Sequence, residues 1–135
     1  MVYIGMQYIR RKIVNDIMGS QLKQRAVAFA LLLKEKTNDS SVIRSYTTYK
    51  IFKMTGMAYS TIKKYIDVLI KMELAEFKDS DLYIKKMSSS SKHRNINIGK
   101  FKIDKTKNIY NQLRDLIFLI IQSHKDYVKS LLRLR

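Results

Sequence analysis

The chain of 135 residues carries 27 lysine and arginine residues against 11 aspartate and glutamate residues, which gives a formal net charge of +16 at pH 7. This balance is typical of proteins that bind polyanions, because cationic side chains displace condensed counterions from phosphates. The sequence has no cysteine, which excludes disulfides, thiolate catalysis and cysteine zinc sites. The length suits one compact domain with an extension, and its core needs no covalent staple.

The sequence indicates no metal site, no cofactor and no transmembrane helix. His93 and His124 are 31 residues apart without a metal-binding spacing, so we expect no metal site and no cofactor. The longest apolar run, Leu116 to Ile121, has six residues, whereas a transmembrane helix needs about 20. We therefore expect a cytoplasmic, nucleoid-associated protein with no membrane partner and no small-molecule substrate.

The first 36 residues divide at Gly19-Ser20. Residues 1–9 fit either a short strand or the start of a helix, and residues 10–18 are weakly helical, so we interpret 1–20 as an N-terminal extension. Residues 21–36 are rich in strong helix formers, with Ser20 in place as the N-cap. Their wide apolar arc predicts a helix at the centre of the main domain, which we place at 21–104, and a polar loop at 37–41 ends this helix.

Residues 46–77 have the layout of two short helices joined by a tight turn. The first segment is apolar at Tyr49, Ile51, Phe52 and Met54, follows a capping Thr47 or Thr48, and stops before Gly56, which can adopt positive φ without steric cost. The second opens near Ser60 and repeats apolar residues at helical spacing. Its buried stripe is expected to contain these residues: Ile62, Tyr65, Ile66, Leu69, Ile70 and Met72.

A β-hairpin is predicted directly after the second helix. Residues 75–78 and 82–87 read as strands around the turn formers Asp79-Ser80-Asp81, and residues 42–45 fit a further short strand or a linker. The serine-rich segment 88–94 is either a linker or the tip of a longer hairpin. In the second case the alternation of residues 95–98 adds a third strand to the same hairpin.

A long helix is predicted over residues 105–135. Its 3-4 spaced apolar seam comprises Ile109, Leu113, Leu116, Ile120, Tyr127, Leu131 and Leu134. The seam can pack on its own domain, mediate self-association or lie in a membrane interface, since basic residues decorate its end. We favour self-association, so residues 105–135 are interpreted as an oligomerisation element of a homodimer.

The segment from Thr48 to Phe77 and the following hairpin resemble the winged helix-turn-helix superfamily of bacterial, plasmid and phage DNA-binding proteins. The motif that carries the resemblance is TGMAYSTIKKYI, residues 55–66. The resemblance implies a mainly α fold with a small β-hairpin wing (α+β) and implies that residues near the second helix face double-stranded DNA. The candidate DNA-binding residues are Thr48, Tyr59, Ser60, Thr61, Lys63 and Lys64 on the helix pair, with Lys92 and Arg94 on the wing.

Two positions depart from the pattern of this superfamily. Ala58 stands where a side-chain helix cap is usual and cannot accept an amide hydrogen bond, so Ser60 is expected to cap instead and to shift the helix start by two residues. Glu73 stands where glycine is common after the second helix, and a glutamate enters the left-handed conformation only at some cost.

The sequence therefore predicts a DNA-binding protein, either a transcription regulator or a replication or partition factor of a phage or mobile element. The alternative is a winged-helix module that binds protein or RNA in a larger assembly. The sequence has no glycine-rich loop of the kind that binds phosphate, and no segment pairs a histidine with a carboxylate for catalysis. We therefore do not expect an enzyme.

Overall fold

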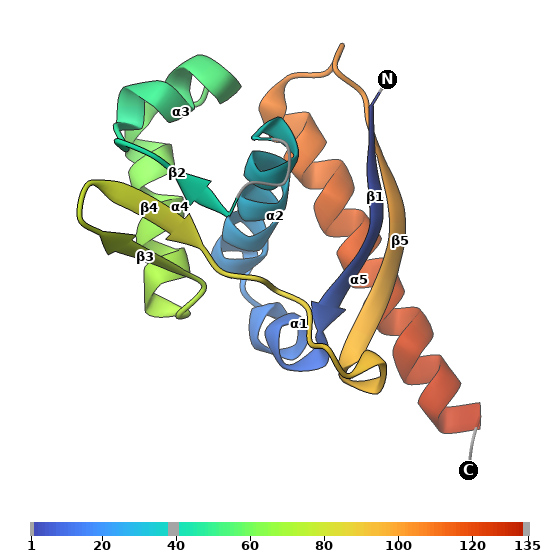
Figure 1. The fold of residues 1–135 in the computed structure, drawn as a ribbon. Coiled ribbons are helices and arrows are strands. Elements are labelled where there is room, and N and C mark those ends of the chain that lie inside the picture. Colours follow the sequence, from blue (N-terminus) through green and yellow to red (C-terminus); the bar gives the residue numbers. More distant parts are fainter. Residues whose placement is uncertain (1, 38–40, 134–135) are drawn as a thin grey trace. The chain divides into compact units, whose positions relative to one another are not determined.

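The computed structural model describes residues 2–37 and 41–133, and within them the chain is a mixed α and β fold with a long C-terminal helix. Its internal contacts divide it into two compact units (Figure 1). Unit 1 combines Met1–Gly19 with Met87–Arg135, and unit 2 is the continuous segment Ser20–Lys86. This division differs from the expected one, because the supposed N-terminal extension belongs to the same unit as the C-terminal helix. The expected loop residues 38–40 and the final two residues lie outside the described part of the chain.

Unit 2 contains six elements in the order helix, strand, helix, helix, strand, strand. These are α2 (Gln21–Lys36), β2 (Val42–Ile43), α3 (Thr48–Thr55), α4 (Tyr59–Lys71), β3 (Ala75–Lys78) and β4 (Asp81–Ile84). The three strands form an antiparallel sheet in the order β2-β4-β3. The helix pair and the hairpin therefore lie where the sequence predicts them, although β4 ends at Ile84 and not at residue 87.

Side-chain caps fix the starts of two of these helices. The hydroxyl of Ser20 accepts from the amide of Lys23 at 3.3 Å, and that of Thr47 accepts from the amide of Lys50 at 3.2 Å. Each cap satisfies one of the amides that a helix leaves unbonded in its first turn. The prediction of Ser20 as a cap is confirmed, and Thr47 is the residue that caps α3.

The core of unit 2 gathers on α2 and α4, which pack on each other. Eight consecutive residues of α2, Ala26–Leu33, are buried, as expected for a central helix. The ring of Phe29 meets that of Tyr65 at a centroid distance of 5.5 Å, a tilted arrangement that aromatic pairs favour. On α4 the predicted stripe is buried at Ile62, Tyr65, Ile66 and Leu69, whereas Ile70 and Met72 are only half-buried.

Unit 1 is built on an antiparallel pair of strands from the two ends of the chain. β1 (Val2–Arg10) pairs with β5 (Asn95–Ile103), and α1 (Arg11–Ile17) follows β1 without a loop (Figure 1). Residues 95–98 do form part of a strand, but the alternative in which this strand extends the β3-β4 hairpin is wrong. β4 is the central strand of its sheet and already bonds β2 and β3 on its two edges, so it has no edge left for β5.

The pairing of β5 with β1 is irregular near Gly99, and the apolar residues of β5 are buried on both sides of this glycine. Ile96 and Ile98 are buried, and so are Phe101 and Ile103, although simple alternation would put the second pair on the opposite face. Gly99 lies between them at φ +73°, and the side chain of Asn97 accepts from its amide at 2.7 Å. The register shifts on both sides of the Gln7–Gly99 pair and is the same before and after it, so the irregularity involves both strands.

The C-terminal helix α5 (Ile109–Arg133) covers this strand pair along its first half only. The seam is buried at Ile109, Leu113, Leu116 and Ile120, whereas Leu131 is 46% exposed. Packing on its own unit, the alternative to self-association, is thus what the first half of the seam does. No helix in the described ranges combines the length and apolar character needed to cross a bilayer.

Candidate nucleic-acid interface

The turn between α3 and α4 is fixed by backbone geometry and one threonine. Gly56 adopts the left-handed conformation at φ +73° and donates from its amide to the carbonyl of Phe52 at 2.7 Å. The hydroxyl of Thr55 bonds the carbonyl of Ile51 at 2.8 Å and accepts from the amide of Met57 at 3.1 Å. The side chain of Met57 is fully buried. These contacts fix the conformation of the turn that joins α3 to α4.

The first turn of α4 is open at its amide end. Ala58 occupies the N-cap position with no side-chain hydrogen bond, and its carbonyl accepts from the amide of Ile62 at 3.0 Å. The expectation that Ser60 caps the helix is wrong, because the helix begins at Tyr59 and Ser60 lies inside its first turn. Without a cap, the first amides of α4 are available to an external acceptor, and the positive end of the helix dipole favours an anion there.

The outward face of α4 is polar and cationic. Ser60, Lys63 and Lys64 are exposed and Thr61 is half-buried, while the opposite face packs in the core. The exposed Asp67 pairs with Lys71 at 3.1 Å, one turn further along. Within the described ranges no carboxylate pairs with Lys63 or Lys64, so their charges are available to a polyanion.

An exposed aromatic strip crosses from α3 to α4. The ring of Phe52 lies 6.2 Å from that of Tyr49 and 5.5 Å from that of Tyr59, and the Nζ atom of Lys53 lies 5.5 Å from the centre of the Tyr49 ring. The three aromatic residues are 40% to 51% exposed. The sequence pattern placed Tyr49 and Phe52 with the apolar residues of the first helix, but Ile51 is the one residue of α3 that is buried.

Thr48 is less available than the other candidates of the helix pair. It is half-buried at the start of α3, and its side chain hydrogen-bonds the phenol of Tyr46. Burial raises the pKa of Tyr46, and the bond to Thr48 lowers it in part. The ring of Tyr46 also meets that of Phe77 at 5.3 Å. Thr48 therefore serves a local contact between the loop before α3 and the hairpin.

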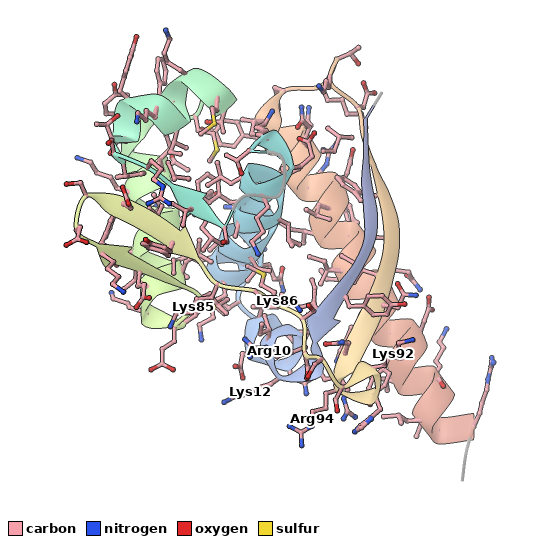
Figure 2. The ribbon with its side chains drawn as sticks, in the orientation of Figure 1. Arg10, Lys12, Lys85, Lys86, Lys92 and Arg94 are labelled. Atoms are coloured by element: carbon pink, nitrogen blue, oxygen red, sulfur yellow. The ribbon has the colours of Figure 1, made fainter. Side chains whose placement is uncertain are left out.

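Lys92 and Arg94 do not belong to the β3-β4 hairpin. They lie in a short 3-10 helix, η1 (Lys92–Arg94), which leads into β5 in unit 1, and Figure 2 labels them with Arg10 and Lys12 of the same unit. Their expected role as wing residues is wrong, since the segment 88–94 does not connect two strands of one hairpin. The true tip, Lys78–Asp81, carries one lysine and two aspartates, a balance that disfavours close approach to phosphates.

The N-terminal run Arg10-Arg11-Lys12 is a group of cations that the sequence analysis did not select. In the structure these residues stand with Arg94 around a cavity in unit 1. Three successive basic residues are a visible signal, but their partner lies more than 80 positions away, so the sequence alone does not bring the four together.

Comparisons with protein-family models, curated proteins and solved structures found no match. The candidate interface is therefore argued from its own geometry. In the described part of the chain no three histidine, cysteine, aspartate or glutamate side chains gather in a way that could hold a metal ion.

Proposed function

We propose that the protein binds double-stranded DNA and that unit 2 is a winged helix-turn-helix whose helix α4 enters the major groove. In such a docking the start of the second helix meets base edges and phosphates. The biological role is that of a transcription regulator or of a replication or partition factor of a phage or mobile element. The proposed DNA-contacting residues all lie in unit 2.

The observation that carries the proposal is the arrangement of α3 and α4 around Gly56 within the order α2-β2-α3-α4-β3-β4. Helices α2 and α3 pack on α4, and Ile62, Tyr65, Ile66 and Leu69 of α4 are buried, so the second helix is supported on one face and free on the other. A rigid helix with one supported face can present its other face to a groove about 12 Å wide.

The chemistry of that free face supports the same proposal. The hydroxyls of Ser60 and Thr61 stand beside the uncapped amides of the first turn, where they can donate to phosphate oxygens. Lys63 and Lys64 follow on the next turn with no carboxylate partner in the described ranges and can reach phosphates or base edges.

A homodimer through α5 completes the proposal. The stripe formed by Tyr110, Phe118, Val128 and Leu132 follows one face of α5, and these residues are 46%, 63%, 39% and 60% exposed. It differs from the seam that packs on unit 1. A second copy paired along this stripe would present two α4 helices to half-sites about 34 Å apart, one turn of duplex.

The aromatic strip favours a second candidate, a module that docks on a protein. Tyr49, Phe52 and Tyr59 give one connected, exposed aromatic surface, and tyrosine and phenylalanine are enriched at the centres of protein interfaces. The same strip includes Tyr59, a candidate DNA contact, so the two functions compete for one surface.

The decisive experiment is the double variant Lys63→Ala, Lys64→Ala, measured against random duplex DNA over a series of salt concentrations. Two lost phosphate contacts should reduce the slope of log affinity against log salt by about 1.8 while the fold is unchanged. The matched control is Lys23→Ala, Arg25→Ala, which removes the same charge from exposed positions on α2. A slope that falls equally in both variants, or in neither, contradicts the proposal and leaves the protein-docking module.

Self-association is tested by sedimentation of the full chain at micromolar concentration. The variant Phe118→Glu, Leu132→Glu should convert a dimer into a monomer, whereas Ser130→Glu, an exposed position outside the stripe, should not. A wild-type protein that sediments as a clean monomer overturns the dimer and leaves the DNA-binding proposal intact for a single half-site.

A further inference from the structure

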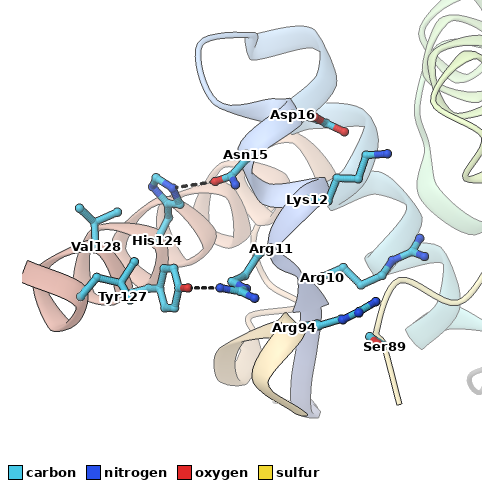
Figure 3. Close-up of a pocket in the computed structure, with 11 residues that line it drawn as sticks. Arg10, Arg11, Lys12, Asn15, Asp16, Ser89, Arg94, His124, Tyr127 and Val128 are labelled. Carbon is cyan, nitrogen blue, oxygen red and sulfur yellow. Dashed lines mark hydrogen bonds between the residues drawn. The ribbon is translucent and has the colours of Figure 1, made fainter. Parts of the chain in front are cut away.

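Unit 1 contains a cavity of about 810 Å³ at the end of the β1-β5 strand pair (Figure 3). Arg10 ends β1 on one side, α1 follows directly with Arg11 and Lys12, and Arg94 of η1 closes a third side. The fourth side is the second half of α5. Tyr127 and Leu131, which continue the seam that is buried in the first half of this helix, line the cavity there. The volume is in the range of pockets that hold small organic ligands.

The charge of the cavity is strongly one-sided. Three arginines and one lysine line it against a single carboxylate, that of Asp16. Across the described ranges no ion pair involves any of these four cations. Like charges held close together repel, so a cluster of this kind is stabilised when an anion binds between its members.

One polar atom in the cavity is left without a partner. The Nε atom of Arg10 is buried and makes no hydrogen bond within the described part of the chain. A buried donor with no acceptor is destabilising, and native structures rarely keep one without a reason. An anion that binds Arg10 with a small movement of its side chain would accept from this nitrogen and remove the deficit.

The cavity walls are held in place before any ligand binds. The guanidinium of Arg11 donates to the hydroxyl of Tyr127, and its carbon Cζ lies 5.7 Å from the centre of the same ring. His124 Nε2 and Asn15 Oδ1 lie 3.2 Å apart, which gives a second tie between α5 and α1 (Figure 3). The backbone amide of Arg10 donates to the carbonyl of Met87 at 2.9 Å. A preformed site loses little entropy on binding.

We propose that this cavity is a binding site for the phosphate group of an organic phosphate. Guanidinium groups match phosphate oxygens in planar, bidentate geometry, and Lys12 adds a point charge at the rim. The side chains of Tyr127 and Leu131 give the opposite wall an apolar surface that suits the carbon part of the ligand. The site lies outside unit 2 and does not depend on the function proposed for it.

Two sources can supply this chemistry, a free nucleotide and the backbone of DNA, and one set of variants distinguishes them. Arg10→Gln and Arg94→Gln each remove a cation of the cavity, and Arg133→Gln is the control, an exposed arginine of the same unit that does not line it. Arg94 is exposed, so its replacement should leave the fold intact even where that of Arg10 does not.

In the first arm, AMP and inorganic phosphate are titrated into each protein by calorimetry. A free-nucleotide site gives measurable binding of AMP to the wild type and to the control, and an affinity about tenfold lower in the two cavity variants. In the second arm, random duplex DNA is titrated over a salt series. A DNA backbone site gives no AMP binding, but each cavity variant lowers the salt slope by about 0.9.

A cavity variant that matches Arg133→Gln in both arms overturns the proposal. The outcome is separable from that of the proposed function, because Lys63→Ala, Lys64→Ala tests unit 2 on its own. A protein that binds AMP in this cavity and fails to bind DNA would refute the DNA-binding function and leave the phosphate site standing.

Discussion

The two units are assembled from the chain in different ways. Unit 2 is continuous, and each of its strands pairs with another strand of the same segment, between residues 42 and 84. Unit 1 is assembled from the two ends of the chain, and its strand pair joins Val2 to Ile103. Closing a long loop costs more entropy than closing a short one, so the long-range pairing forms only when it is supported by a core of its own.

The difference extends to how each unit displays cations. In unit 2 the lysines of interest stand on the exposed face of one helix, so a single element carries the surface. In unit 1 the cations come from β1, α1 and η1 and converge on a cavity. An exposed face suits an extended partner such as a duplex, whereas a cavity suits a single group such as a phosphate.

The largest expected effect comes from a charge placed in either core. Ile66→Asp should unfold unit 2 and Leu116→Asp should unfold unit 1, since the two side chains are 4% and 1% exposed. A buried, unpaired carboxylate costs several kcal/mol, comparable to the ~5 to 15 kcal/mol that stabilises a whole domain. Hydrogen exchange read residue by residue shows which amides lose protection.

The pattern of lost protection tests whether the comparison of two units is valid. Separate units predict that Ile66→Asp exposes amides in α2 and α4 and spares β1 and β5, with the reverse for Leu116→Asp. Uniform loss across the chain in both variants would show one cooperative domain. A matched exposed substitution outside the dimer stripe, Ser130→Asp, should leave protection unchanged in both units.

The same contrast explains which features the sequence could predict. In unit 2 each element is marked locally: Ser20 caps α2, Gly56 ends α3 in the left-handed conformation, and Asp79 stands at the hairpin turn with φ +58°. Local hydrogen bonds and allowed backbone angles are properties of neighbouring residues, so the order of these elements follows from spacing, although the start of α4 and the end of β4 differ from the prediction.

The strand pairing of unit 1 was not predicted from the sequence, because it joins residues that are far apart along the chain. Residues 95–98 alternate as a strand, but alternation alone does not identify the partner strand, and the pairing with β1 was not among the alternatives. The irregular pairing at Gly99 also interrupts the alternation that would have extended the strand to Ile103. The apolar seam of α5 was predicted from its spacing. Its division into a buried half and a half that lines the cavity was not, because this division depends on where α1 ends.

A smaller effect, confined to unit 2, is expected at Glu73. This residue follows α4 at φ +61°, where a side chain is strained and glycine is not. Glu73→Gly should raise the free energy of unfolding of unit 2 by up to about 1 kcal/mol. The substitution removes the strain of a left-handed residue, and the extra entropy that glycine gives the unfolded chain offsets part of this gain. Thermal unfolding measures the gain, with Glu76→Gly in strand β3 as the control that should lower stability. A loss of stability in Glu73→Gly would mean that its side chain makes a favourable contact that outweighs the strain.

The smallest effect is expected in unit 1, at the loop before α5. The side-chain hydroxyl and the backbone amide of Thr106 both donate to the carboxylate of Asp104, and with a smaller contribution from Lys107 they hold its pKa below the usual range. A carboxyl whose folded pKa is lowered stabilises the fold above its unfolded pKa, about 3.9, and this stabilisation disappears as the pH falls through the folded value. Asp104→Asn should therefore be slightly less stable than the wild type at pH 7, and the difference should vanish at low pH. Denaturant melts at a series of pH values, followed by the protection of amides in α5 and β5, measure it. A difference independent of pH would assign the effect to lost geometry and not to charge, and a difference that appears in the amides of α4 would show that the two units are coupled.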